Sequence, residues 1–105
     1  MLEDILKVTL LKETINTDNP LTKDGEPNIS QSTTEIYGKR MSITQNEYYS
    51  ARTKGFKPDL CLEINCFEYN NERFCVVNNI KYEIYRTYQK INSEFIELYL
   101  QAEMQ

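Results

Sequence analysis

Residues 44–64, TQNEYYSARTKGFKPDLCLEI, hold the transition that decides the fold of this chain. The stretch begins with a helical pattern, breaks at Gly55 and Pro58, and continues as the alternation of a strand. Glycine is a common helix end, and proline cannot continue a helix because it lacks a backbone N–H. The sequence therefore predicts one short helix over residues 44–54, followed directly by β structure.

The helical part carries its own start signal. Thr44 followed three residues later by Glu47 fits a capping box, in which each side chain accepts a hydrogen bond from a backbone N–H at the helix start. Tyr48, Tyr49 and Ala51 recur on one side of about two turns, so we expect them to form the apolar face.

Both flanks of the helix have the alternation of strands. Before it, residues 4–15 form one strand and residues 35–43 a weaker one, in which Gly38 is interpreted as a bulge. After it, four short alternating runs are separated by the turn pairs Asn70-Asn71, Asn78-Asn79 and Asn92-Ser93. Connections this short leave no room for crossover helices. The fold class predicted is therefore mainly all-β, a small antiparallel β-barrel or sandwich of about six strands with one short helix.

Residues 16–34 are predicted to form a long flexible loop. They are rich in Asn, Asp, Pro, Gly, Ser and Thr and lack any apolar period. Long loops in compact domains are usually functional or disordered, and we interpret this one as a projecting contact loop, mobile in the free subunit and ordered in an assembly. The whole chain, residues 1–105, is expected to be a single domain.

Charge is unevenly distributed along the chain. The net charge is −4, yet residues 36–58 hold five bases and one acid, between two segments that are each net −4. A patch of bases like this is most often a solvated face, but because it coincides with the helix we expect it to make a contact with a partner. Its five bases and the helix tyrosines are the candidate contact residues: Lys39, Arg40, Tyr48, Tyr49, Arg52, Lys54 and Lys57.

No catalytic or metal-binding constellation is found. The chain has no histidine, no glycine-rich phosphate loop and no nucleophile elbow. Glu63, Glu83 and Glu97 alternate with apolar residues and are interpreted as solvent-facing strand positions. Cys61 and Cys66 are expected to face opposite sides, which argues against a shared metal site. We predict no enzyme activity, no cofactor and no metal.

The N-terminal region has neither the basic start nor the long apolar run of a signal peptide. Lys7 and Lys12 interrupt the one apolar stretch that resembles a membrane span. We therefore expect the protein to remain in the reducing cytoplasm in which it is made, without a membrane partner.

Several short motifs in a fixed order extend over nearly the whole chain outside the loop. They are E-Y-Y-x-A (Glu47–Ala51), G-F-K-P-D (Gly55–Asp59), F-E-Y-N (Phe67–Asn70), Y-x-I-Y-R-T-Y (Tyr82–Tyr88) and I-E-L-Y (Ile96–Tyr99). In order and spacing they resemble the head-closure proteins of tailed bacteriophages, also called head-tail joining or stopper proteins. The chain departs from that family at Ser50 and Arg52, where smaller residues are expected, and this concerns the end of the helix.

The resemblance implies a structural virion protein of the phage neck. Such a protein forms a ring, typically a dodecamer, between the portal and its adaptor on one side and the tail-terminator and tail proteins on the other. DNA passes through the ring as cargo, and the protein is made in the cytoplasm of the bacterial host. The alternative is a small β-barrel nucleic-acid-binding module with tyrosines as stacking platforms, although its grooves are usually positive and this chain is acidic.

Overall fold

The computed structural model describes the backbone of residues 5–15 and 29–103 and the side chains of residues 5–12 and 32–103. Within these residues the chain is mostly β. The elements in chain order are β1 (Ile5–Ile15), β2 (Ile29–Met41), α1 (Gln45–Thr53), β3 (Leu60–Asn65), the 3-10 turn η2 (Cys66–Glu68), β4 (Phe74–Val77), β5 (Ile80–Tyr88) and β6 (Phe95–Ala102).

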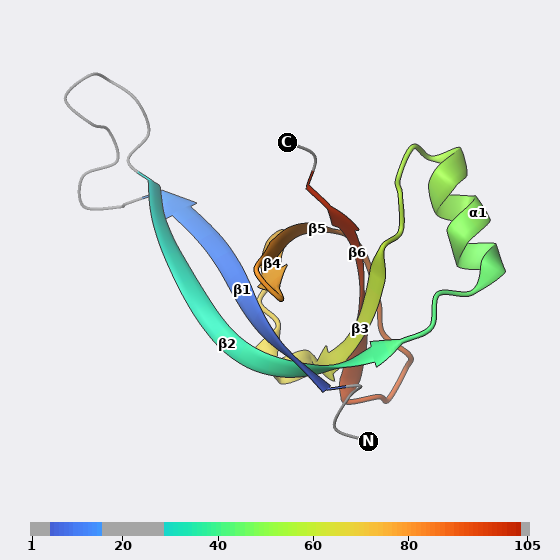
Figure 1. Cartoon of the computed structure of the whole chain (residues 1–105). Coiled ribbons are helices and arrows are strands. Elements are labelled where there is room, and N and C mark those ends of the chain that lie inside the picture. The colour runs from blue at the N-terminus through green and yellow to red at the C-terminus, as the bar shows by residue number, and fades with distance from the viewer. Residues whose placement is uncertain (1–4, 16–28, 104–105) are drawn as a thin grey trace.

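The six strands of the described part close into an antiparallel barrel (Figure 1). Their order around the barrel is β1-β2-β3-β6-β5-β4, and β4 pairs back with β1. Strands β1 to β3 and strands β4 to β6 thus form two three-stranded units, each in chain order. The pairings β3–β6 and β1–β4 join these units. The predicted fold class is confirmed, and of its two forms the barrel is the one adopted.

The interior of the barrel is filled by alternate residues of every strand, because successive side chains of a strand point to opposite faces. The buried cluster comprises Val8, Leu10, Ile36, Leu62, Ile64, Cys75, Val77, Ile84, Ile96, Leu98 and Leu100. The barrel therefore has a packed core of its own side chains.

Gly38 is not a bulge. The β1–β2 register runs without a break through the Leu6–Gly38 pair. Gly38 instead occupies an inward position where a Cβ would lie 3.1 Å from Cγ2 of Ile64 and 3.4 Å from Cγ2 of Val8. The close packing of Ile64 and Val8 leaves no room for a side chain at Gly38, which explains the glycine. The interpretation of Gly38 as a bulge was therefore wrong. The bulge of the described sheet lies in β5, between Ile84 and Arg86.

Asparagine forms the turns as the sequence predicted. Asn71, Asn78, Asn79 and Asn92 all have positive φ, from 54° to 65°. Asn tolerates this left-handed region better than most residues, so these positions favour tight connections over continued strand.

The second strand begins earlier than predicted. Residues 29–34, assigned from composition to the long loop, pair with β1 as far as Ile29–Ile15. β4 pairs with β1 only over Val8–Leu11, so the far part of the β1–β2 hairpin is a two-stranded ribbon that extends from the barrel (Figure 1). Backbone pairing needs no apolar side chain, which is why hydrophobic periodicity missed it. Residues 16–28, the rest of the predicted loop, lie outside the described residues.

Candidate functional site

The single α-helix of the described chain lies on the outside of the barrel, beside the segment that leads from it into β3 (Figure 1). Thr44 is its N-cap, and the Thr44 Oγ1 accepts a hydrogen bond from the Glu47 N–H at 3.1 Å. Lys54 is the C-cap, and Gly55 follows with φ of +91°. The predicted bounds of residues 44–54 are confirmed, and Ser50 and Arg52 do not disturb the helix end.

Ala51 is the one buried residue of α1. Tyr48 and Tyr49 were expected to share the apolar face with Ala51, but their side chains are 43% and 65% exposed. That expectation was wrong because the helix makes contact with the barrel through a polar residue instead. Glu47, one turn before Ala51, faces the barrel and is nearly buried, with 9% of its side chain exposed.

Both carboxylate oxygens of Glu47 are bound by β5. Oε1 accepts from Nε of Arg86 at 3.1 Å and also from Nη2, and Oε2 accepts from the Tyr85 hydroxyl at 3.1 Å. One half of the predicted capping box is therefore wrong. The Glu47 side chain attaches the helix to the barrel and does not accept the predicted hydrogen bond from a backbone N–H at the helix start. The hydrogen bond to Glu47 raises the pKa of Arg86.

The β5 bulge explains why two successive residues reach the same carboxylate. Neighbouring residues of a regular strand point to opposite faces, so Tyr85 and Arg86 would be separated by the sheet. The register shift between Ile84 and Arg86 leaves Tyr85 unpaired and re-aims the side chains. Both then lie on the outer face with Glu47.

An aromatic layer lies between α1 and the barrel. The rings of Phe56 and Tyr85 stack at 4.8 Å, Tyr99 lies 6.4 Å from Tyr85, and the Arg86 guanidinium lies 4.6 Å from the Tyr99 ring centre. Burial, and after it the Glu47 charge, raises the pKa of Tyr85. Burial also raises the pKa of Tyr99, as does its hydrogen bond to Glu97. Tyr85 and Tyr99 thus pack in an intramolecular contact between α1 and the barrel.

Cys61 is buried in this same layer. It lies on the outer side of β3, while its neighbour Leu62 belongs to the barrel core. Burial and the nearby Glu97 charge raise the pKa of the Cys61 thiol to about 11. Cys66 packs against the barrel core, so the predicted opposite placement of these two cysteines is confirmed.

The seven candidate contact residues are all exposed: Lys39, Arg40, Tyr48, Tyr49, Arg52, Lys54 and Lys57. They fall into two groups, one at the end of β2 and one on α1 and the segment after it. The structure brings three of them together on the helix. The Arg52 guanidinium lies 5.9 Å from the Tyr48 ring centre, and the Tyr48 and Tyr49 rings meet edge to face at 6.4 Å. We call Tyr48, Tyr49 and Arg52 the helix face.

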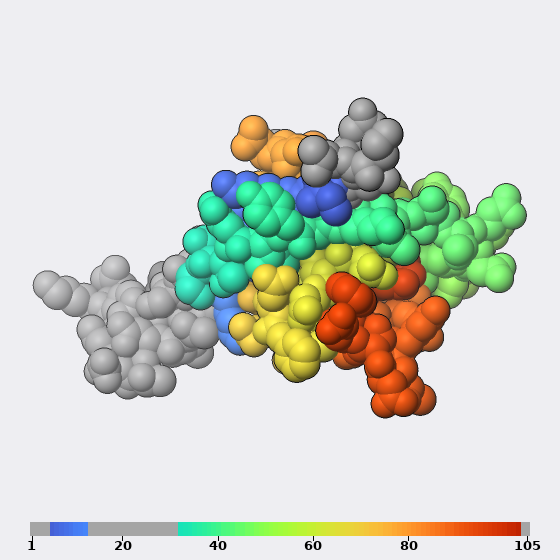
Figure 2. All heavy atoms as spheres, turned by 90° about the horizontal axis from the view of Figure 1, so that it is seen from below, coloured from blue at the N-terminus to red at the C-terminus, as the bar shows by residue number. Residues whose placement is uncertain are grey.

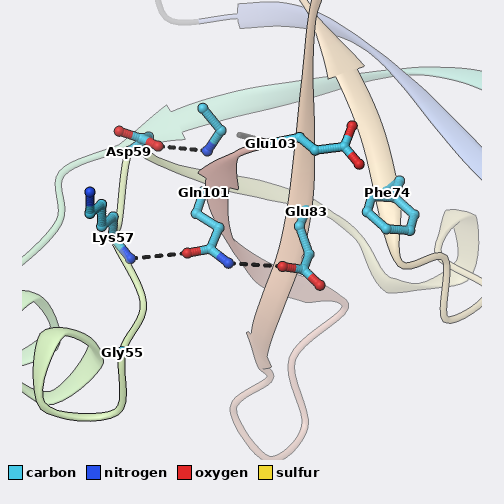
Figure 3. Close-up of a pocket in the computed structure, with 8 residues that line it drawn as sticks. Gly55, Lys57, Asp59, Phe74, Glu83, Gln101 and Glu103 are labelled. Atoms are coloured by element: carbon cyan, nitrogen blue, oxygen red, sulfur yellow. Dashed lines mark hydrogen bonds between the residues drawn. The ribbon is translucent and has the colours of Figure 1, made fainter. Parts of the chain in front are cut away.

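A groove of about 570 Å³ lies between the segment after α1 and the outer faces of β4 to β6 (Figure 3). Its floor is a cross-strand row in which Glu83 is paired with Phe74 on one side and Gln101 on the other. The Gln101 amide accepts from the Lys57 backbone N–H at 3.0 Å and donates to Glu83 at 2.8 Å.

The carboxylates around this groove already have partners. Arg73 donates to Glu83 through Nε and Nη2, both at 3.2 Å, and Asp59 accepts from the Ala102 N–H at 2.6 Å. Glu83 and Glu97, predicted to face solvent, point outward but are half-buried and hydrogen-bonded, and Glu63 is also half-buried. Within residues 5–15 and 29–103, no group of three or more Cys, Asp or Glu side chains is placed to hold a metal ion.

Sequence reasoning missed one exposed apolar surface at the end of the barrel. Phe67 in η2 is 83% exposed, Ile91 in the β5–β6 turn 92%, and Phe95 at the start of β6 44%. Figure 2 shows the η2 segment in yellow next to the red start of β6, with the orange-red β5–β6 turn protruding beside them. Glu68 and Glu94 are exposed in the same segments. We call Phe67, Glu68, Ile91, Glu94 and Phe95 the end patch. Apolar residues in turns were the signal that could have revealed it.

In the described part of the chain, no helix has the length and apolar character needed to cross a membrane. Comparison of this chain with protein-family models, with curated proteins and with solved structures found no match in any of the three.

Proposed function

We propose that this protein is a structural subunit of the neck of a tailed bacteriophage, part of a ring between the portal-side adaptor and the tail. In this role it closes the DNA-filled head and receives the tail, without catalysis and without a cofactor. The proposal comes from the resemblance of the ordered motifs to head-closure proteins, and it places the protein in the virion at the head-tail junction.

One structural observation supports a role in contacts above others. The barrel interior is occupied by its own side chains, while α1 is fastened outside the barrel and carries its tyrosines and bases on the exposed side. A helix with one buried residue, Ala51, adds little to the barrel core. Exposed Tyr and Arg side chains on a rigid support are typical of protein–protein contacts.

The alternative, a nucleic-acid-binding module, has the same exposed tyrosines and Arg52 in its favour. Two observations weigh against it. The chain has a net charge of −4, and the Phe56, Tyr85 and Tyr99 rings pack against each other under α1. Binding of the isolated chain to single-stranded DNA, with an affinity that falls steeply with salt, would favour this alternative.

The proposed function is tested by deleting the gene from the phage genome that encodes it. We expect DNA-filled heads without tails in electron micrographs, and recovery of tailed, infectious particles when the wild-type chain is supplied from a plasmid. Tailed, infectious particles from the deletion strain without the plasmid would refute the neck role.

The same strain tests the positive segment. Arg40→Glu combined with Lys54→Glu changes two exposed side chains, which should alter the unfolding free energy by about 0.5 kcal/mol or less. Like charges at an interface cost several kcal/mol, so we expect full heads with few tails. A normal yield of tailed particles from this variant would show that these bases face solvent in the virion.

A further inference from the structure

The end patch combines apolar exposure with local rigidity. The Asn65 side chain accepts from the Phe67 N–H at 2.9 Å, and Asn65 is paired with Phe95 in the β3–β6 ladder. The Cys66 N–H donates to the Glu94 carbonyl at 2.8 Å. These bonds hold η2 and the start of β6 side by side. A surface that is already ordered loses little conformational entropy on binding, which favours association.

The turn that carries Ile91 is also held in place. The Gln89 side-chain amide donates to the Ser93 carbonyl at 2.8 Å, and the Ser93 N–H donates to the Lys90 carbonyl at 3.1 Å. Ile91 is 92% exposed on this turn, although an apolar side chain of this size is favoured out of water. A protruding Ile91 with Phe67 and Phe95 has the character of the core of a protein–protein interface.

The charges around the two surfaces are opposite. The end patch carries Glu68 and Glu94, with Lys90 nearby, whereas the helix face carries Arg52, with Lys54 at the helix end. Glu47 does not weaken the positive side, because Arg86 and Tyr85 bind its carboxylate toward the barrel. Opposite potentials across a contact favour a specific pairing and its register.

We propose that the end patch of one copy of this protein binds the helix face of a second copy. Tyr48 and Tyr49 cover Phe67 and Ile91, and Arg52 approaches Glu68 and Glu94. Because the two surfaces differ, the contact is head-to-tail, and each copy in a pair keeps one free surface to bind a further copy. The inference deepens the proposed neck function and rests on it for its biological setting.

The test uses two variants of the full chain that are each defective in one surface. Phe67→Ser with Ile91→Ser removes the end patch, and Tyr49→Ser with Arg52→Glu removes the helix face. All four side chains are exposed, so thermal melting should show both variants folded. Ile80→Ser, a change of an exposed apolar side chain at the start of β5, is the matched control.

Sedimentation velocity of the purified wild-type chain should show assemblies that grow with concentration. Each variant alone should be monomeric, since loss of such anchor residues weakens a contact by about tenfold or more. An equimolar mixture of the two variants should give a dimer and nothing larger, because one intact contact remains. Ile80→Ser should behave as the wild type.

A wild-type chain that remains monomeric at the highest soluble concentration would overturn the inference. A mixture of variants that stays monomeric while the wild type associates would also overturn it, since another surface would then join the copies. Either result leaves the head-tail assay of the deletion strain unchanged, so the contact and the neck role fail separately.

Discussion

Gly38 and Gly55 show that two glycines of one chain can be required for different physical reasons. At Gly38 the constraint is space, because an added methyl group would lie 3.1 Å from Cγ2 of Ile64. At Gly55 the constraint is the backbone, with φ of +91° and no atom within 4 Å of an added Cβ. The sequence indicated the second, since glycine after a helix is a common end signal. It did not indicate the first, which depends on strands far apart in the chain.

We predict that Gly38→Ala lowers the unfolding free energy by about 1–3 kcal/mol, the usual cost of overfilling a packed core. Urea unfolding measures it. Ile64→Leu removes the Cγ2 methyl, so the double variant should be destabilised by less than the sum of the single changes. Additive effects, or a Gly38→Ala variant as stable as the wild type, would contradict the account of this position.

At the scale of elements, α1 is joined to the barrel by a few specific contacts. Glu47 binds Tyr85 and Arg86, Ala51 is buried, and Phe56 stacks on Tyr85. The helix and its ends were predictable from local signals at Thr44 and Gly55. Its orientation was not, because the β5 bulge that aims Tyr85 and Arg86 leaves no mark in the pattern of the sequence. For this reason Tyr48 and Tyr49 were wrongly assigned to the face of α1 that packs against the barrel.

We predict that Glu47→Gln loosens α1 without unfolding the barrel. The amide loses the charge pairing with Arg86, and partial loss of a buried polar contact costs about 1–3 kcal/mol. Alkylation read by mass spectrometry should show faster modification of Cys61, which lies under the helix, while Cys75 inside the barrel remains protected. Glu68→Gln, a change at an exposed acid, is the control.

Equal acceleration at Cys61 and Cys75 would mean global unfolding and would count against a separately attached helix. Unchanged Cys61 reactivity in the Glu47 variant would show that the ion pair does not hold the helix.

For the whole molecule, buried cysteine thiols with raised pKa values make the unfolding free energy depend on pH in the alkaline range. Burial raises the pKa of the Cys75 thiol to about 12, and burial with the Glu97 charge raises that of Cys61 to about 11, both from 9.0. A group with a raised pKa in the fold binds its proton more tightly when folded. Its contribution is complete below about pH 9 and is lost as the pH rises through the folded pKa.

We therefore predict that the unfolding free energy is constant near neutral pH and falls between about pH 9 and about pH 12. The raised pKa values of Tyr85 and Tyr99 add to the loss above pH 10, their ordinary value. Urea unfolding across this range measures the slope, and Cys75→Val should make it shallower than in the wild type. An increase of stability over the same range would contradict the sign of these shifts.

The fold at this scale was largely predictable, because the strands from β3 to β6 alternate, apart from the β5 bulge, and the turns between them contain asparagine. The far part of β2 could not be predicted, because it is held by backbone pairing with β1. Residues such as Thr33 and Thr34 are equally compatible with a loop and with a strand. The end patch was not predicted, because apolar residues were assigned to strands and contact surfaces were inferred mainly from the distribution of charged residues. The function assigned from motif order stays a proposal.

The strand order also has a consequence for the order in which the strand pairings form during folding. β1 to β3 and β4 to β6 are each built from consecutive strands, so most pairings within a half are more local in the chain than the pairings between the halves. The seams between the halves join distant residues, six pairs along β3–β6 and four along β1–β4. Until both the β3–β6 and the β1–β4 pairings have formed, the sheet is open and its apolar face is exposed to water. We expect the docking of the four-residue β4 onto β1 to be the last step of folding, because this pairing joins the paired strands that lie farthest apart in the chain.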